Sequence, residues 1–408
     1  MTRGRRTSTR RSTPAARWAH RVVRTGEVLL ATAVVAGVGL VAVHLGTANA
    51  HRVVLSAEHH PATAASTNHT LRVTSISPAA GASAVSPTTT VEVRFSEPVV
   101  RGSALPSINP PIPGRWTRVG HSELRFTPSA PAMPLVTETI TVPAGRYGVR
   151  ADDGAELASS VTSRFQVRDG SILRLQQVLA QLGYLPLTWT QSAATPPASS
   201  GNIDLTELYQ PPTGQFAWRY PSTPPTLQAA WKVGVDNHMT TGAMVAFEVK
   251  DGLPGYTSIR PQMWSALLTA EADQTMNPEG YTYALVSQTQ PESLTLWHDG
   301  TVVYTSVANT GIAQTPTPVG NFFVYRRFAS TTMEGSNPNG SYYVDHGVRW
   351  VNYFDGGAAI HGFIRAAYGF PQSLGCVELP VSHAAIAWKW IHYGTVVTVL
   401  PEPGSTAA

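Results

Sequence analysis

The 408-residue chain has very little cysteine: Cys376 is its only thiol. A lone cysteine cannot form an internal disulfide, and the paired cysteines of a structural metal site are absent as well. No His-x-x-x-His pair occurs either, so the sequence predicts no metal site. A single cysteine is either a small buried hydrophobic residue or a nucleophile, and its neighbours must decide between the two.

Charge is also sparse, at 13% of the residues, whereas glycine (34) and proline (32) are frequent. This composition favours strands, turns and linkers over long helices. The formal net charge of +4 is misleading, because residues 1–27 hold eight arginines against one glutamate. The rest of the chain is slightly acidic, which excludes a broad basic surface for nucleic acid.

The arginine-rich tail runs into the chain's one long uncharged apolar stretch, within residues 28–46. Arginines before an apolar run are typical of a membrane anchor or of the hydrophobic part of a signal peptide. Ala48-Asn49-Ala50 fits a small-x-small cleavage site, so both alternatives stay open, and a buried core helix is the third. Anchor and signal alike place the chain beyond residue 50 outside the cytoplasm, and residues 47–70 are expected to be a linker.

Residues 71–168 contain short runs in which apolar and polar side chains alternate. Leu71-Arg72-Val73-Thr74-Ser75-Ile76 and Val91-Glu92-Val93-Arg94-Phe95 show the two-residue period of half-buried strands. Several such strands separated by turns predict a β-sandwich. The stretch 77–99 resembles bacterial immunoglobulin-like wall-protein domains, which implies a spacer or adhesion module without chemistry of its own.

Residues 169–275 change character, because Leu and Val recur at helical spacing from Ile172 to Leu182 and Gly183 follows. The Leu175-Gln176 pair and Leu182-Gly183-Tyr184 resemble the small helical peptidoglycan-binding domain. Its second half is expected at 241–268, after an insertion at 187–240 that is rich in Pro, Thr and Ser. Aromatic residues of the insertion either pack it onto its domain or stack on sugars, and packing is the simpler interpretation.

Strand patterns return in residues 280–402, with a hairpin predicted at Asp299-Gly300. Three motifs follow in order: Thr315-Pro316-Thr317-Pro318-Val319-Gly320, Ile360-His361-Gly362 and Ser373-Leu374-Gly375-Cys376-Val377. Together they resemble the YkuD-type L,D-transpeptidase catalytic domain of cell-wall synthesis. The predicted fold is therefore multidomain and mainly β: an Ig-like sandwich, a small helical domain and a β-rich catalytic domain.

The resemblance assigns roles to five residues. Cys376 is the nucleophile, His361 its base, and the Gly362 carbonyl fixes the imidazole tautomer. Gly375 permits a tight turn, whose amides are candidates for an oxyanion hole. Ser373 either orients the histidine or the substrate, or bonds its own backbone in a turn.

The chain departs from the family pattern at Leu374, where a second histidine is common, and at Glu378, where Asn or Arg is common. Both positions are predicted to bear on substrate contact, and a carboxylate at Glu378 raises the thiol pKa if it lies close. The segment 325–357 is predicted to be a long loop that acts as a lid. The resemblance implies the same and places Tyr353 and Trp350 near the substrate, with packing under the loop as the alternative role for both.

These observations predict an extracytoplasmic L,D-transpeptidase that cross-links diamino acids of peptidoglycan stem peptides through a Cys376 thioester. The reaction needs no cofactor, because both steps are acyl transfer. The expected partners are a donor tetrapeptide stem, an acceptor amine, the membrane through the N-terminal segment, and carbapenem β-lactams as covalent inhibitors. Two alternatives remain: an L,D-carboxypeptidase or peptidase that uses water, and a non-catalytic wall-binding protein.

Overall fold

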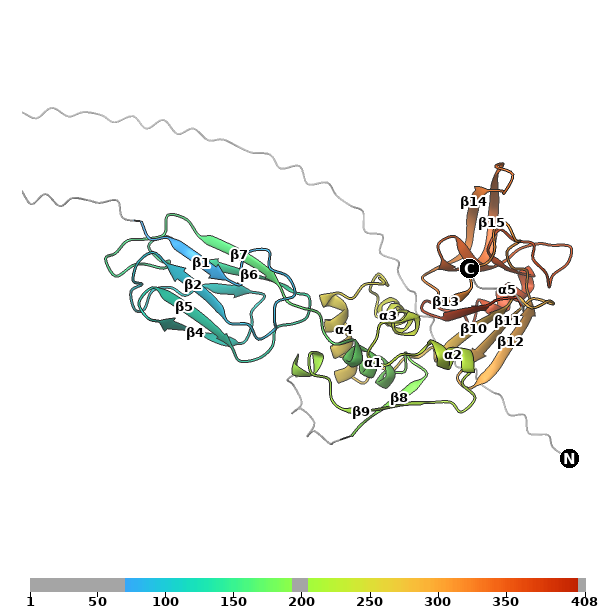
Figure 1. Cartoon of the computed structure of the whole chain (residues 1–408), viewed down its shortest axis with the longest axis horizontal. Coiled ribbons are helices and arrows are strands. Elements are labelled where there is room, and N and C mark those ends of the chain that lie inside the picture. The colour runs from blue at the N-terminus through green and yellow to red at the C-terminus, as the bar shows by residue number, and fades with distance from the viewer. Residues whose placement is uncertain (1–69, 193–204, 403–408) are drawn as a thin grey trace, which may run out of the picture. The chain divides into compact units, whose positions relative to one another are not determined.

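A computed structural model describes residues 70–192 and 205–402. The predicted tail, anchor or signal segment (28–46) and nearly all of the linker lie outside the described residues. Within the described part, no helix is long and apolar enough to cross a membrane. The predicted mainly β, multidomain fold is confirmed, since strands make up most of the regular structure (Figure 1).

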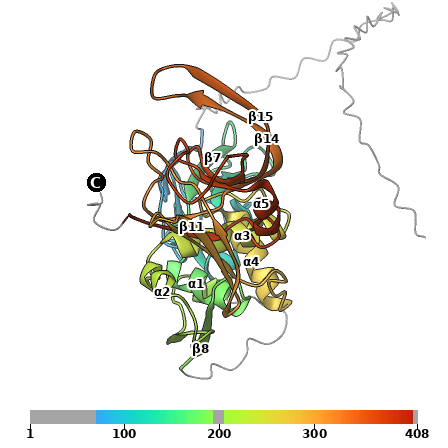
Figure 2. The same ribbon diagram turned by 90° about the vertical axis from the view of Figure 1, so that its right-hand side faces the viewer.

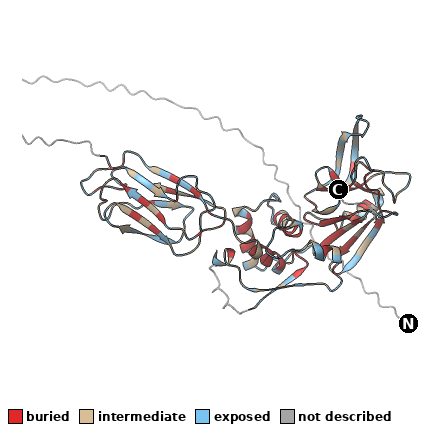
Figure 3. Ribbon diagram, viewed as in Figure 1, coloured by how far each residue is buried: buried red, intermediate tan, exposed pale blue. Residues whose placement is uncertain are grey.

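The first described domain is a sandwich of two antiparallel sheets, ordered β1-β2-β5-β4 and β3-β6-β7. Along β2 and β5, buried residues alternate with more exposed ones, as Figure 3 shows. The buried set, which includes Val93, Phe126 and Ile140, forms the core of this domain. The strands are β1 (Val73–Ser77), β2 (Val91–Phe95), β3 (Ser107–Asn109), β4 (Gly114–Val119), β5 (Glu123–Pro128), β6 (Thr137–Val142) and β7 (Val161–Gln166).

The helical segment begins with α1, which ends as its sequence predicts. After the last turn Gly183 has φ +81°, its amide donates to Ala180 O, and the Tyr184 amide donates to Leu179 O. This pair of bonds is the Schellman motif, which needs glycine at the left-handed position. The elements of the segment are α1 (Ile172–Gln181), β8 (Leu187–Gln191), the 3-10 turn η1 (Leu205–Leu208), β9 (Gly214–Trp218), α2 (Pro225–Ala230), α3 (His238–Lys250) and α4 (Pro261–Ala272).

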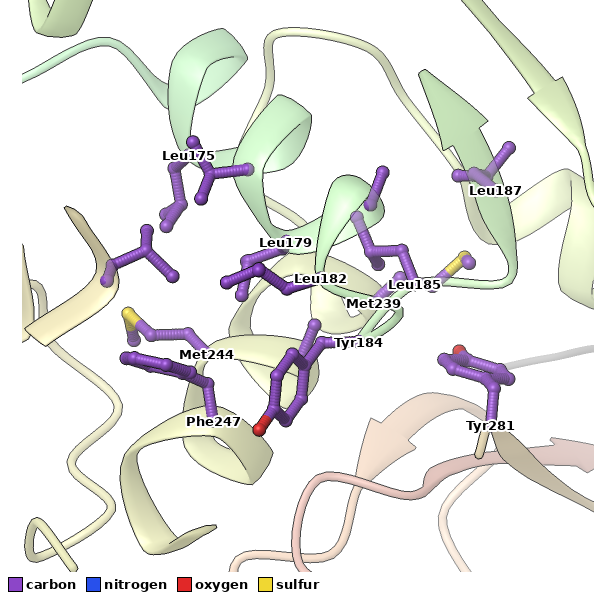
Figure 4. Close-up of a cluster of buried hydrophobic side chains, with 14 of the residues drawn as sticks. Leu175, Leu179, Leu182, Tyr184, Leu185, Leu187, Met239, Met244, Phe247 and Tyr281 are labelled. Carbon is purple, nitrogen blue, oxygen red and sulfur yellow. The ribbon is translucent and has the colours of Figure 1, made fainter. Parts of the chain in front are cut away.

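The Leu-Gln pair of α1 is structural. Gln176 is fully buried, and its amide donates to Thr240 Oγ1 and to two carbonyls of the loop before α3. Leu175, Leu179 and Leu182 pack with Met244 and Phe247 of α3 (Figure 4). The assignment of this segment to the peptidoglycan-binding domain stays a prediction.

The C-terminal part consists of two sheets that pack around one core. The first sheet has the order β12-β11-β10-β18-β13 and the second β14-β15-β16-β17. Ala284 and Val286 of the first sheet meet Ile360 and Val377 of the second in this core. The elements are β10 (Thr282–Ser287), β11 (Ser293–His298), β12 (Thr301–Val307), β13 (Gly320–Phe323), β14 (Arg326–Ser336), β15 (Tyr342–Asp355), β16 (Ala358–Gly362), β17 (Val377–Leu379), α5 (Val381–Ala387) and β18 (Val396–Leu400).

The predicted loop at 325–357 is wrong, because this segment forms the antiparallel hairpin β14–β15. Figure 2 shows it as a long two-stranded ribbon that projects from the rest of the domain. Ser336 pairs with Tyr342, and Gly340 turns the chain at φ +84°. The polar composition suggested a loop, but strands that project from a sheet have no core to face and need few apolar side chains.

Candidate active site

Cys376 and His361 are brought together by two short parallel strands. His361 lies on β16, and Cys376 immediately precedes β17. In the parallel register Ile360 pairs with Val377 and His361 with Glu378, so Cys376 lies just before the first paired residue of β17, and both Cys376 and His361 line one cavity. Parallel pairing needs a crossover connection, and here residues 363–376 supply it.

The environment of Cys376 favours the neutral thiol. Burial raises the pKa of the thiol to about 11, a backbone hydrogen bond from Ala359 opposes this rise, and the Glu378 carboxylate adds to it. The sulfur lies 3.8 Å from the Gly357 carbonyl oxygen, to which the thiol donates. Since the thiolate is the nucleophilic form, this thiol needs a base.

His361 is buried, and its ring has a fixed tautomer. Nδ1 lies 3.2 Å from the Gly362 carbonyl oxygen, which can only accept, so Nδ1 carries the proton. Nε2 then keeps its lone pair and can accept a proton. Burial lowers the pKa of His361, while the Gly362 carbonyl acts in the opposite direction. The imidazole is therefore neutral at neutral pH, as a general base must be.

The turn before Cys376 is tied by the Ser373 hydroxyl. This group donates to the Cys376 carbonyl over 2.6 Å and accepts from the Gly375 amide over 3.1 Å. Ser373 thus takes the turn role of its two predicted roles, and it is not among the residues that line the cavity. Gly375 has φ +111°, a conformation that favours glycine. Its amide is already bonded, which leaves the Cys376 amide as the candidate oxyanion donor.

Glu378 does not face the substrate as a free carboxylate. It is buried and forms a bidentate ion pair with Arg365, with both N–O distances 2.7 Å. The guanidinium also lies over the Phe363 ring, 4.7 Å from its centroid. The Glu378 charge is therefore balanced by an arginine of the crossover segment.

A cavity of about 830 Å³ opens beside the cysteine–histidine pair. Leu374, Glu378 and Tyr353 line it, as predicted for substrate contact, and the hairpin adds Met333 and Tyr343. Trp350 is the exception: it packs against Trp388, with ring centroids 5.7 Å apart, and lies outside the lining. Trp350 has a left-handed backbone (φ +59°) within β15, and its contact with Trp388 corresponds to packing, the alternative role for this residue.

Sequence reasoning missed Arg365 and the hairpin residues Tyr343 and Asp345, which also line the cavity. No motif marks them, and an arginine four residues after His361 was the only available signal. Thr317, within the Thr-Pro motif, also contacts the cysteine turn. Its hydroxyl accepts a hydrogen bond from the Gly311 amide (2.8 Å) and donates one to the Cys376 carbonyl (3.5 Å). No cluster of three potential metal ligands occurs in the described residues.

The arrangement suits acyl transfer by a thiol. A neutral thiol, a neutral imidazole with a free Nε2 and a backbone amide at the nucleophile surround one end of a cleft. The cleft is lined both by the cysteine turn and by residues of the hairpin strands.

Comparison with known proteins agrees with this geometry. Residues 281–399 match the family model of the L,D-transpeptidase catalytic domain, and residues 67–167 match that of a bacterial Ig-like domain. The chain thus carries an L,D-transpeptidase catalytic domain, and its predicted sandwich is an Ig-like domain. No curated protein matches the chain.

Solved structures similar to this chain include three L,D-transpeptidases. The catalytic domain of the E. faecium enzyme is 28% identical, covers 29% of this chain and 96% of its own length, and has a TM-score of 0.27. An L,D-transpeptidase from Mycobacterium smegmatis is 14% identical; the match covers 82% of this chain and 100% of the M. smegmatis chain, with a TM-score of 0.26. L,D-transpeptidase 3 from Mycobacterium tuberculosis, solved with a faropenem-derived adduct, is 13% identical. The match covers 81% of this chain and 98% of the M. tuberculosis chain, with a TM-score of 0.27.

Proposed function

We propose that the protein is an extracytoplasmic cell-wall L,D-transpeptidase that joins diamino acids of neighbouring peptidoglycan stems through a Cys376 thioester. The observation that carries the proposal is that the chain's only thiol lines the same cavity as a buried imidazole whose Nδ1 is bonded to the Gly362 carbonyl. The N-terminal segment 28–46 is proposed to hold the enzyme at the membrane or to direct its export.

In the first step Cys376 Sγ attacks the carbonyl carbon of the donor's diamino acid while His361 Nε2 takes the thiol proton. Proton transfer accompanies attack, because a thiol with a pKa of about 11 is scarcely ionised at neutral pH. The Cys376 amide is proposed to stabilise the developing oxyanion. The C–N bond to the terminal D-alanine then breaks, and the leaving amine receives the proton from His361.

In the second step the side-chain amine of an acceptor stem attacks the thioester carbonyl. His361 accepts the amine's proton and returns it to the departing sulfur, so that the free thiol is regenerated. One peptide bond is made for each one broken, and no cofactor is required. Water in place of the amine would give the carboxypeptidase alternative.

The test is incubation of residues 51–408 with a purified disaccharide-tetrapeptide, followed by mass spectrometry of the products. The proposal predicts a dimer that has lost one D-alanine, and no product from Cys376→Ala or His361→Ala. A tripeptide without dimer would instead identify the hydrolase. An unchanged substrate with a folded protein would favour the wall-binding alternative.

A further inference from the structure

A second cavity, of about 310 Å³, lies where α3 meets the catalytic strands. It shares no lining residue with the cavity that contains Cys376. Its volume is at the lower end of the range for small-molecule sites. The lining combines apolar and charged side chains, among them Tyr184, Ala246, Val249, Lys250, Arg327 and His392.

Arg327 gives the cavity its main chemical feature. Its guanidinium donates to Asn352 Oδ1 and to the Trp388 carbonyl, both over 2.8 Å, and lies 3.8 Å from the centroid of the Trp388 indole. Both hydrogen-bond partners are neutral, and Arg327 forms no ion pair within the described residues. Burial lowers its pKa to about 10. A largely buried charge normally has a counter-charge, and here the protein supplies none in contact.

No carboxylate contacts Arg327 among the described residues. Glu279 is the one carboxylate in the lining; it raises the pKa of Arg327 from a distance, and its contacts are with Lys250 (2.9 Å) and His392 (3.8 Å). Arg327 and Lys250 therefore leave an excess of positive charge in the cavity. An anion that enters it meets a rigid guanidinium held in place by two hydrogen bonds and a stacking contact.

The apolar part of the lining limits the kind of anion. Tyr184, Ala246 and Val249 offer no charge, so a fully hydrated inorganic ion would leave this surface without contacts. A carboxylate on a compact apolar body fits both parts of the lining, because the guanidinium fork matches the two oxygens of a carboxylate.

We propose that this cavity is a binding site for a small organic carboxylate, with its charge on Arg327 and its apolar body against Ala246 and Val249. The site is separate from the catalytic cavity, and the inference does not depend on the proposed function.

Benzoate is a suitable probe, and benzamide is its neutral counterpart of the same shape. Titration of residues 51–408 by calorimetry should show benzoate binding at least about tenfold more tightly than benzamide, since only the former uses the guanidinium charge. Arg327→Met should weaken benzoate binding about tenfold. Glu279→Gln should strengthen it several-fold, because removal of the competing carboxylate raises the local positive potential.

Ala246→Leu separates loss of the site from loss of the fold. It adds volume to the apolar part of the lining, leaves every charge in place and should abolish benzoate binding. Because Ala246 lies close to Gly394, circular dichroism checks that the variant is folded. The proposal is overturned if benzamide binds as well as benzoate, if Ala246→Leu binds normally, or if wild type shows no binding at about 50 mM benzoate. If Arg327→Met fails to fold, the proposal is tested by the loss of benzoate binding in Ala246→Leu and its gain in Glu279→Gln.

Discussion

At the scale of single residues, the environments of Cys376 and His361, the proposed catalytic residues, favour their neutral forms. Burial acts on Cys376 and His361 in opposite directions, since it raises the pKa of the thiol and lowers that of the imidazole. Both shifts favour the uncharged state. A neutral thiol beside a neutral imidazole differs from a preformed thiolate–imidazolium pair. In the neutral arrangement His361 would take the thiol proton during the reaction and would not serve as a permanent counter-ion to a thiolate.

A first prediction concerns the thiol's titration. Because its pKa is about 11, the rate of Cys376 alkylation by iodoacetamide should rise about tenfold per pH unit from pH 7 to 10 without levelling off. In Glu378→Gln the curve should shift to lower pH, because the variant removes a negative charge that disfavours the thiolate. A wild-type plateau below pH 9 would show that the thiolate is preformed.

A second prediction concerns the Arg365–Glu378 pair. Arg365→Gln leaves the buried Glu378 carboxylate without its partner, and removal of one member of a buried pair costs about 3 kcal/mol of unfolding free energy. Because Arg365 is partly exposed, the loss should fall at or below this figure. The double variant with Glu378→Gln should recover most of it in urea denaturation. Equal instability of the single and double variants would mean that the charge pairing is irrelevant.

At the scale of elements, two pieces of backbone shape the site: the turn 373–376 and the β14–β15 hairpin. The turn holds Cys376 in place through Ser373 and a left-handed Gly375, while the hairpin supplies one wall of the cleft. The turn is packed into the domain. The hairpin tip is not, since most of its residues are exposed or half-buried.

A third prediction tests the turn. Around Gly375 a new Cβ would find no atom closer than 3.7 Å, so Gly375→Ala has room and its cost is backbone strain alone, about 1–3 kcal/mol. Gly357→Ala is the matched control, because this glycine lines the same cavity, has open space around it and no positive φ. Thermal unfolding should separate the two variants. Identical unfolding temperatures would contradict the need for a left-handed residue at 375.

A fourth prediction tests the hairpin. Met333 pairs with Asp345, so residues 334–344 can be replaced by Asn-Gly to give a shorter hairpin. The unfolding temperature should change little, because the deleted residues lie outside the main core. The KM for the donor stem should rise about tenfold, because one wall of the cleft is lost. Unchanged KM would show that the hairpin tip does not contact substrate.

Much of the site could be predicted from the sequence, because its motifs are local. The Gly375-Cys376 turn, the Asp299-Gly300 hairpin and the His361-Gly362 contact each involve neighbours in the chain. The Arg365–Glu378 pair could not be predicted, because it depends on how β16 and β17 are aligned. The β14–β15 hairpin was not predicted, because both of its faces are largely exposed and polar, so its sequence lacks the apolar–polar alternation that indicates a strand.

At the scale of the whole described unit, the helical segment and the catalytic sheets share a core. Tyr283, Trp297 and Val396 of the catalytic strands are buried together with Leu179, Phe247 and other helical residues. The sheet β12-β11-β10-β18-β13 is thus covered on one face by helices and on the other by the second sheet. This explains why the sequence of β10 is apolar on both faces.

A fifth prediction follows from this shared core. A fragment of residues 280–402 exposes Tyr283, Trp297 and Val396 to water and should be less stable than residues 169–402, which retain the helices. Calorimetry should give one transition for the longer fragment and a lower unfolding temperature, or aggregation, for the shorter one. Equal unfolding temperatures would mean that the helices do not stabilise the catalytic sheets.

The most direct test of the central claim is the intact mass of residues 51–408 after incubation with a carbapenem. A Cys376 nucleophile activated by His361 should give a mass increase of one drug molecule, absent in both Cys376→Ala and His361→Ala. An adduct that persists in Cys376→Ala, or no adduct on the folded wild-type protein, would contradict a Cys376 nucleophile activated by His361.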